Sequence, residues 1–185
     1  KIVEQAKRSG VDELTLFAWS TENWGRPNDE YKSIESLLIV GVSSLAKKCL
    51  EENVRVSFVG LQERLSLKSL EAIRYIKNLT KSQNGMKCNV CFNYSGTTDI
   101  LKSINHLVKQ GVTMFSEELI RQNLISNVVS DVDLLIRTGG DNRVSNFCLW
   151  QIYQAYFIVV DKYWPDFGKA DFRSCIERFM KMRIA

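Results

Sequence analysis

The chain has 185 residues, of which 45% are hydrophobic and 25% are charged, with only 10 Gly and 2 Pro. This length and composition predict one globular domain over residues 1–185, and they exclude disordered, collagen-like and low-complexity chains. The longest nearly apolar run covers residues 36–46. It is far shorter than the roughly 20 residues of a transmembrane helix, so we expect no membrane span.

Charge and cysteine content bear on nucleic-acid binding, on the cellular compartment and on metal or redox sites. The net charge is +4, from 25 basic and 21 acidic residues that form no stripe, so we do not expect nucleic-acid binding. The 5 cysteines are an odd number in a chain too long to need disulfide staples, which favours a reducing, intracellular compartment. Cys88 and Cys91 form a CxxC pair, but residues three apart on a strand point to opposite faces. His106 is the single histidine and lies in a predicted helix, so we expect no zinc or redox site.

Predicted strands and helices alternate along the chain. Short apolar or alternating runs predict strands over residues 14–19, 54–60, 87–94, 133–137 and 156–160. Amphipathic stretches predict helices over residues 2–9, 29–52, 65–80, 100–110 and 169–182, and a further helix that opens at residue 116. The alternation predicts an α/β fold with a mostly parallel central sheet flanked by helices. Because no start signal precedes the first helix, we expect at least one further element upstream.

Two polar segments follow the first and fourth predicted strands, residues 20–27 and 137–146. In parallel sheets, ligands bind beyond the carboxyl ends of the strands, so both segments lie where a site is expected. In the second segment, Arg137 and Arg143 flank Gly139-Gly140 and suit a diphosphate, because two guanidinium groups can grip phosphate oxygens bidentately. Ser145 precedes a predicted helical stretch, residues 147–153, and would offer its hydroxyl at a helix N-terminus. An ordinary turn with solvated arginines is an equally good interpretation.

The first segment carries hydroxyl, carboxylate, amide, indole and guanidinium groups within seven residues, at Ser20, Thr21, Glu22, Asn23, Trp24 and Arg26. A helix cap at Ser20 or Asn23, preceded by a packed Trp, would explain some of these residues without any ligand. A Trp beside an Arg is more than a cap requires, which favours a binding role.

Three stretches carry a resemblance: residues 17–27 (FAWSTENWGRP), residues 133–151 (DLLIRTGGDNRVSNFCLWQ) and residues 164–167 (WPDF). In this order and spacing they resemble the cis-prenyltransferase family, whose best-known members are the undecaprenyl and dehydrodolichyl diphosphate synthases. The resemblance runs from about residue 10 to the C-terminus. It implies a six-stranded, mostly parallel sheet, usually in a homodimer. It also implies Mg²⁺-dependent condensation of an allylic diphosphate with isopentenyl diphosphate, giving a Z-prenyl diphosphate and releasing diphosphate.

The resemblance also implies roles for individual residues. Asn23 matches a residue assigned to proton removal, and Ser20 is the second catalytic candidate. The expected substrate-binding residues are Ser20, Thr21, Glu22, Trp24, Arg26, Arg137, Arg143, Val144 and Ser145. Glu30 matches a family position at the start of the following helix. The apolar face of that helix would line a tunnel for the growing chain, through Ile34, Leu37, Leu38, Val42 and Leu45.

Two departures from the family pattern concern the metal. The family's phosphate loop and its catalytic Asp match nothing in this chain and are expected upstream, so we expect the given residues alone to be inactive. The family has a Glu that supplies a magnesium ligand from the partner site, and Tyr156, whose phenol is a poor magnesium ligand, stands at its position here. Asp141 replaces another Glu and keeps a carboxylate. Position 156 could reflect simple packing, an altered metal requirement or a different condensation. No metal ligand is therefore assigned within the chain.

Two alternative functions remain open at this stage. One is the irregular head-to-middle condensation of two dimethylallyl diphosphates, as in lavandulyl diphosphate synthases. The other is a non-catalytic partner subunit of a heteromeric cis-prenyltransferase, although such subunits usually lose the first motif, which is whole here. Cytoplasm and plastid are both compatible with the sequence.

Overall fold

The structure of the chain is a computed structural model that describes residues 1–26 and 28–184, without the side chains of residues 28 and 29. Pro27, which ends the first motif, lies outside the described residues.

Parallel strands form two sheets in the described residues. The first has the order β1-β3-β2, with β1 over Glu13–Ser20, β2 over Arg55–Val59 and β3 over Lys87–Tyr94. The second pairs β4 (Leu134–Thr138) with β5 (Tyr156–Val160). Each strand is a short apolar or alternating run, and all pairs are parallel because helices or long crossings separate them. The predicted α/β fold with parallel strands is confirmed.

The single six-stranded sheet that the resemblance implied differs from what is seen. Five described strands divide between two sheets, because β1 and β4 share no hydrogen-bonded ladder. Side chains connect them instead. The Glu13 carboxylate on β1 accepts hydrogen bonds from the Ser130 amide (2.9 Å) and hydroxyl (2.8 Å), just before β4, and from Asn89 on β3 (2.7 Å).

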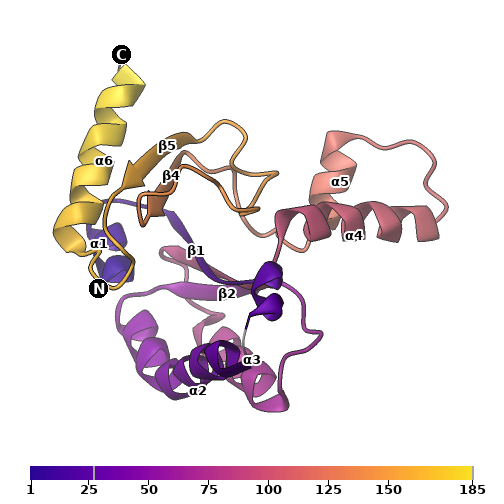
Figure 1. Cartoon of the computed structure of the whole chain (residues 1–185), viewed down its shortest axis with the longest axis horizontal. Coiled ribbons are helices and arrows are strands. Elements are labelled where there is room, and N and C mark those ends of the chain that lie inside the picture. The colour runs from indigo at the N-terminus through magenta and orange to yellow at the C-terminus, as the bar shows by residue number, and fades with distance from the viewer. Residues whose placement is uncertain (27, 185) are drawn as a thin grey trace.

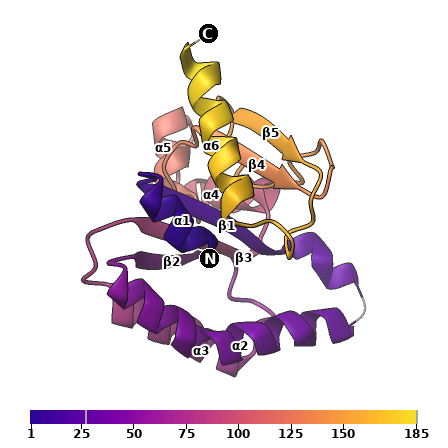
Figure 2. The ribbon, with the colours of Figure 1, turned by 90° about the vertical axis from the view of Figure 1, so that its left-hand side faces the viewer.

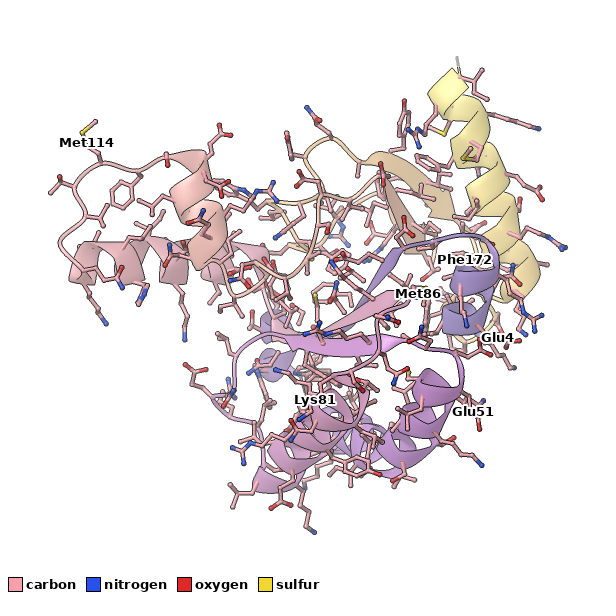
Figure 3. All side chains as sticks on the ribbon, turned by 180° about the vertical axis from the view of Figure 1, so that it is seen from behind. Glu4, Glu51, Lys81, Met86, Met114 and Phe172 are labelled. Atoms are coloured by element: carbon pink, nitrogen blue, oxygen red, sulfur yellow. The ribbon has the colours of Figure 1, made fainter. Side chains whose placement is uncertain are left out.

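Helices cover both sides of this strand layer (Figures 1 and 2). α2 and α3 lie side by side along one face of the three-stranded sheet, whereas α1 and α6 pack together on the other side. α4 and α5 project away from the body, with Met114 near the tip of the projection (Figures 1 and 3). The helices are α1 (Ile2–Arg8), α2 (Asn28–Glu51), α3 (Leu67–Thr80), α4 (Gly96–Lys109), α5 (Glu117–Asn123) and α6 (Lys169–Ile184), with a short 3-10 helix, η1, over Thr21–Gly25.

Two helix predictions were wrong in detail. α4 begins at Gly96 rather than near residue 100. Residues 147–153, predicted as helical, form successive turns. The cause is the backbone at Ser145, Asn146 and Cys148, which all have left-handed φ angles (49°, 61° and 41°) that no right-handed helix accommodates.

The core has two parts, and the CxxC cysteines point into different ones. Cys88 lies in a cluster that joins α1, α2, α3 and α6 to the sheets, whereas Cys91 lies in a second cluster beneath the turns after β4. The opposite-face prediction is confirmed. The Cys91 sulfur lies 3.8 Å from that of Cys148, and all five cysteines are free and buried. In the described part of the chain, no helix is long and apolar enough to cross a membrane.

Candidate functional site

The loops after β1 and β4 meet in space, although they lie more than a hundred residues apart in the sequence. The Asn146 amide of the second loop donates a hydrogen bond to Glu22 Oε1 of the first (2.7 Å). Beneath this contact, the Phe17 ring of β1 stacks on Phe147, with ring centroids 4.9 Å apart. The two predicted segments therefore form one polar surface at the carboxyl ends of the strands.

Ser20 ends β1 and begins η1. Its backbone is extended, and its hydroxyl oxygen accepts a hydrogen bond from the Glu22 amide (3.3 Å), which makes it the N-cap of η1. The Ser20 hydroxyl also contacts the Glu22 carboxylate, at Oε2. The helix-cap interpretation is confirmed for Ser20, and Glu22 holds the same hydroxyl in place. Thr21, the next residue, is half-buried in η1.

Trp24 is packed on several sides. Its ring lies 4.4 Å from the Tyr31 ring of α2 and 5.9 Å from the Trp19 ring of β1. The Arg64 guanidinium lies over it at 4.4 Å, a cation–π contact. Trp24 Nε1 donates to Asn93 Oδ1 at 2.7 Å, at the end of β3. The indole is thus fixed by α2, β1, β3 and the segment before α3.

Asn23 and Arg26 have different surroundings. Asn23 is half-buried, and among the described residues its side-chain amide has no hydrogen-bond partner, which leaves it available to a ligand. Arg26 forms an ion pair with Glu30 (3.2 Å) along the start of α2. Within residues 1–26 and 28–184, it forms no ion pair with Asp141 of the second loop.

The second loop depends on two glycines. Gly139 and Gly140 have left-handed φ angles of 89° and 71°, and a Cβ on Gly140 would lie only 2.6 Å from Asp161 Oδ1. Their amides donate to the carbonyls of Lys162 (2.8 Å) and Val160 (3.1 Å), just after and at the end of β5. Glycine is required here because a residue with a Cβ is destabilised at these positive φ angles.

Arg137 and Arg143 converge on one carboxylate, that of Asp141. Arg137 Nη2 donates to Asp141 Oδ2 at 3.2 Å, and Arg143 donates to it through Nε (3.0 and 3.1 Å) and Nη2 (2.9 Å). These contacts hold the pKa of Asp141 below its ordinary value, chiefly through the hydrogen bonds from Arg143, and raise the pKa of Arg143. The Arg143 side chain is 81% exposed, whereas that of Arg137 is 32% exposed. Arg137 Nε is buried and lacks a partner among the described residues, so an anion could satisfy it.

Val144 and Ser145 follow this ion cluster. Val144 is half-buried and packs against the second core cluster, so it anchors the loop. Ser145 is exposed, with φ of 49°, and no helix follows it. The predicted helix N-terminus at Ser145 was therefore wrong. Its hydroxyl and the two arginines remain on one short turn.

Tyr156 lies at the opposite end of the β4-β5 sheet. It pairs with Leu134, whereas Arg137 pairs with Val159, three residues further along. That spacing corresponds to about 10 Å along the strands. The Tyr156 ring packs edge-on against Phe179 of α6 (5.5 Å), and it borders a cavity of about 140 Å³ together with Asp131 and Asp133.

The predicted tunnel residues of α2 do not share one environment. Val42 is buried in the core, whereas Leu37 is 69% exposed. A cavity of about 200 Å³ lies elsewhere, between β2 and α3, bordered by Phe58, Leu61, Ile73 and Arg74 among others.

Carboxylate and imidazole ligands for a metal do not gather in the described residues. Within residues 1–26 and 28–184, no group of three His, Cys, Asp or Glu side chains could hold an ion. Asp141 already accepts from two arginines, and Tyr156 brings no carboxylate.

Sequence reasoning missed two asparagines. Asn146 joins the loops, and Asn93 is buried and holds Trp24 while donating to the carbonyls of Leu61 (3.0 Å) and Glu63 (2.8 Å). Both have left-handed φ angles, 61° and 55°. The sequence signal for both was an Asn, a residue that tolerates this conformation, within a turn (Asn146) and at a strand end (Asn93).

Comparison with known proteins identifies the family. The sequence model of a family described as "Putative undecaprenyl diphosphate synthase" matches residues 1–184. The chain belongs to this prenyltransferase family. It is 38% identical to an isoprenyl transferase of Staphylococcus saprophyticus over 183 residues, 96% of this chain and 72% of that protein. It is 36% identical over 185 residues to the ditrans,polycis-undecaprenyl-diphosphate synthase of Escherichia coli, covering 97% of this chain and 73% of that enzyme.

Solved structures of family members have the same fold. Lavandulyl diphosphate synthase from Lavandula x intermedia, in complex with dimethylallyl diphosphate, superposes with a TM-score of 0.90 at 29% identity, over 96% of this chain and 80% of that one. A probable undecaprenyl diphosphate synthase from Campylobacter jejuni gives a TM-score of 0.86 at 31% identity, over 97% of this chain and 85% of that one. The predicted cis-prenyltransferase resemblance is confirmed.

Proposed function

We propose that the protein condenses an allylic diphosphate, dimethylallyl or longer, with isopentenyl diphosphate to give a Z-prenyl diphosphate. The observation that carries the proposal is the meeting of the two loops through Asn146 and Glu22. This contact supports a common site for the hydroxyl of Ser20 and the arginines of the second loop. Membership of a prenyltransferase family supports the same reaction.

The proposed chemistry assigns the arginine loop to the diphosphate of isopentenyl diphosphate. Arg137 and Arg143 are permanently charged and can donate bidentate hydrogen bonds, and the Ser145 hydroxyl adds a donor on the same turn. Asp141 occupies these guanidinium groups in the structure, so a diphosphate would compete with a carboxylate for donors already gathered at one point.

The proposed reaction breaks the allylic C–O bond, and the departing diphosphate carries away the bonding electrons. The double bond of isopentenyl diphosphate attacks the allylic carbon, and one of its protons is then lost. Asn23, whose amide is free among the described residues, would orient the group that takes this proton. Ser20, Thr21, Glu22, Trp24 and Arg26 would close the site from the other side, because the Trp24 indole can exclude water from the allylic carbon.

Magnesium is the ion we propose for this reaction, but the described residues do not by themselves fit a magnesium site. They offer no three-ligand cluster, and Asp141 is held by arginines. Mg²⁺ usually takes one or two carboxylates together with substrate phosphates. We therefore propose that the carboxylate that holds the ion comes from outside these residues.

Position 156 gives a test of this metal proposal. In the proposed homodimer, position 156 would serve the partner's site. We therefore expect Tyr156→Glu, which adds a carboxylate beside Asp131 and Asp133, to lower the magnesium concentration needed for half-maximal activity. Activity measured against magnesium concentration checks this. An identical curve would leave Tyr156 as a packing residue against Phe179.

The two alternative functions are less well supported. Relatives at 36–38% identity are named isoprenyl transferase or undecaprenyl diphosphate synthase, which favours regular condensation over the head-to-middle reaction. The intact first motif disfavours a non-catalytic partner subunit. We further propose that residues 1–185 act as one domain in a homodimer, in an intracellular compartment where the five free cysteines stay reduced.

Product analysis of the full-length protein tests the proposed reaction. It is incubated with magnesium and dimethylallyl diphosphate, with and without isopentenyl diphosphate, and the dephosphorylated alcohols are identified by mass spectrometry. We expect a linear Z-prenyl alcohol only when isopentenyl diphosphate is present. A branched ten-carbon alcohol from dimethylallyl diphosphate alone would establish the irregular reaction instead, and no product would favour the partner subunit.

A further inference from the structure

Asn146 occupies an unusual place among the polar residues of the site. Its carbonyl accepts from the Gly96 amide (2.8 Å), and its Oδ1 accepts from the Thr97 amide (2.9 Å), in the first turn of α4. Its Nδ2 lies 2.7 Å from Ser95 Oγ and 3.0 Å from Thr97 Oγ1. Ser95 makes no side-chain cap of its own, so Asn146 caps α4 from 49 residues away.

The same Nδ2 reaches the first loop. It donates to Glu22 Oε1 at 2.7 Å, and the other oxygen of this carboxylate contacts the Ser20 hydroxyl. Within residues 1–26 and 28–184, the Asn146–Glu22 contact is the one hydrogen bond between the two loops. A continuous chain of polar contacts therefore runs from α4 through Asn146 and Glu22 to Ser20.

The backbone around Asn146 allows its side chain to contact both Glu22 and α4. Its φ of 61° is one that Asn tolerates better than most residues. A Cβ on Gly96 would lie 3.0 Å from the Asn146 carbonyl and 2.7 Å from Leu149, so glycine permits the close approach of α4. These constraints fix the direction of the side chain.

We propose that Asn146 is a positioning residue that sets the Ser20 hydroxyl through Glu22 and holds the first loop in register with the arginine loop. The inference deepens the proposed function and rests on it. An amide suits this role because it donates to a carboxylate and accepts from a backbone N–H at the same time. A purely structural role, capping α4, would use only the contacts with residues 95–97.

Exchanging the Asn146 amide and the Glu22 carboxylate distinguishes a positioning role from a role in capping α4. Asn146→Asp keeps the shape, the cap acceptor and the tolerated backbone, but it places a second carboxylate against Glu22. We expect kcat/KM for both substrates to fall at least about tenfold, since a hydrogen bond to a charged group is lost and repulsion replaces it. In the double variant Glu22→Gln/Asn146→Asp, the introduced glutamine donates to the introduced carboxylate. We expect it to recover at least about fivefold of the loss, as coupled neighbours do in a double-mutant cycle.

The matched control is Asn105→Asp, the same change at an exposed position of α4, which should leave both constants unchanged. Losses that simply add in the double variant would overturn the proposal, because a structural cap does not couple to Glu22. Recovery of kcat/KM would support it.

Melting temperatures of the same full-length variants give a second readout that needs no activity. We expect Asn146→Asp to lower the melting temperature and the double variant to restore part of it. If the wild-type protein forms no prenyl product, the proposed function fails. The double-mutant cycle of melting temperatures still shows whether Asn146 and Glu22 interact. Additive melting shifts would overturn the contact whatever the activity.

Discussion

The loops after β1 and β4 are held in place by different means. The first loop is fixed from outside itself: Trp24 contacts Trp19, Tyr31 and Arg64 and donates to Asn93. The second loop also has outside contacts, through Gly139, Gly140 and Asn146, but its charged groups are ordered from within, by the ion cluster centred on Asp141. The first loop is therefore positioned by tertiary contacts. In the second loop, the arginine side chains are positioned by a carboxylate of the same loop.

Because of this difference, substitutions in the two loops should affect different properties, stability in the first and ligand binding in the second. Substitutions in the first loop should lower the free energy of unfolding, because they remove packing and a hydrogen bond with distant elements. Removal of a charge from the second loop should lower ligand binding with little effect on stability, because its ion pairs are exposed.

The largest expected effect is that of Arg143→Ala. We expect kcat/KM for isopentenyl diphosphate to fall about ten- to a hundredfold, as for loss of a hydrogen bond to a charged group, with an unchanged melting temperature. Steady-state kinetics and thermal melts measure both. Arg173→Ala is the control, since Arg173 is an exposed arginine beside a carboxylate on α6 and lies outside both loops. Equal activity in the two variants would remove Arg143 from the site.

Trp24→Phe should act on stability. The substitution keeps an aromatic ring but leaves the buried Asn93 Oδ1 without its donor. We expect a loss of about 1–3 kcal/mol in the free energy of unfolding, measured by urea denaturation. An unchanged midpoint would show that the indole does not anchor the first loop.

Gly140→Ala tests the internal order of the second loop. The φ of 71° and the contact with Asp161 predict a cost of about 1–2 kcal/mol in the free energy of unfolding. Gly41→Ala, in the exposed interior of α2 with nothing within 4 Å of the new Cβ, is the control and should stabilise by up to about 1 kcal/mol. Equal shifts in the two variants would contradict the assigned strain.

The smallest expected effect concerns pH. The pKa of Asp141 lies below its ordinary value of 3.8, so its stabilising contribution is present above that pH and is lost as pH falls through the lowered pKa. Wild type and Asp141→Asn should therefore differ slightly in melting temperature at pH 6 and converge toward pH 3. A difference that grows on acidification would contradict the ion cluster.

Much of this arrangement follows from local sequence patterns. Apolar runs ending at polar turns predict β1 and β4 and place the two loops at one edge, because parallel strands share their carboxyl ends. The Gly139-Gly140 turn likewise follows from residue type. These features depend on neighbours in the sequence, which periodicity can reveal.

Other features, some local and some dependent on distant residues, were beyond the sequence pattern. Residues 147–153 look helical, but left-handed backbone at Ser145, Asn146 and Cys148 turns the chain aside. Asp141 pairs with both arginines, and Asn146 bridges to Glu22, through contacts that spacing alone does not reveal. The division into two sheets also reflects which strand edges meet, a property of tertiary structure.

A structure of the full-length protein bound to isopentenyl diphosphate would test the assignment of the diphosphate to the arginine loop. We predict that its diphosphate lies within hydrogen-bonding distance of Arg137, Arg143 and Ser145, with Asp141 displaced from Arg143 and Asn146 still bound to Glu22. A diphosphate bound elsewhere, such as beside Arg74 in the cavity between β2 and α3, with the Asp141 ion pairs intact, would contradict the account.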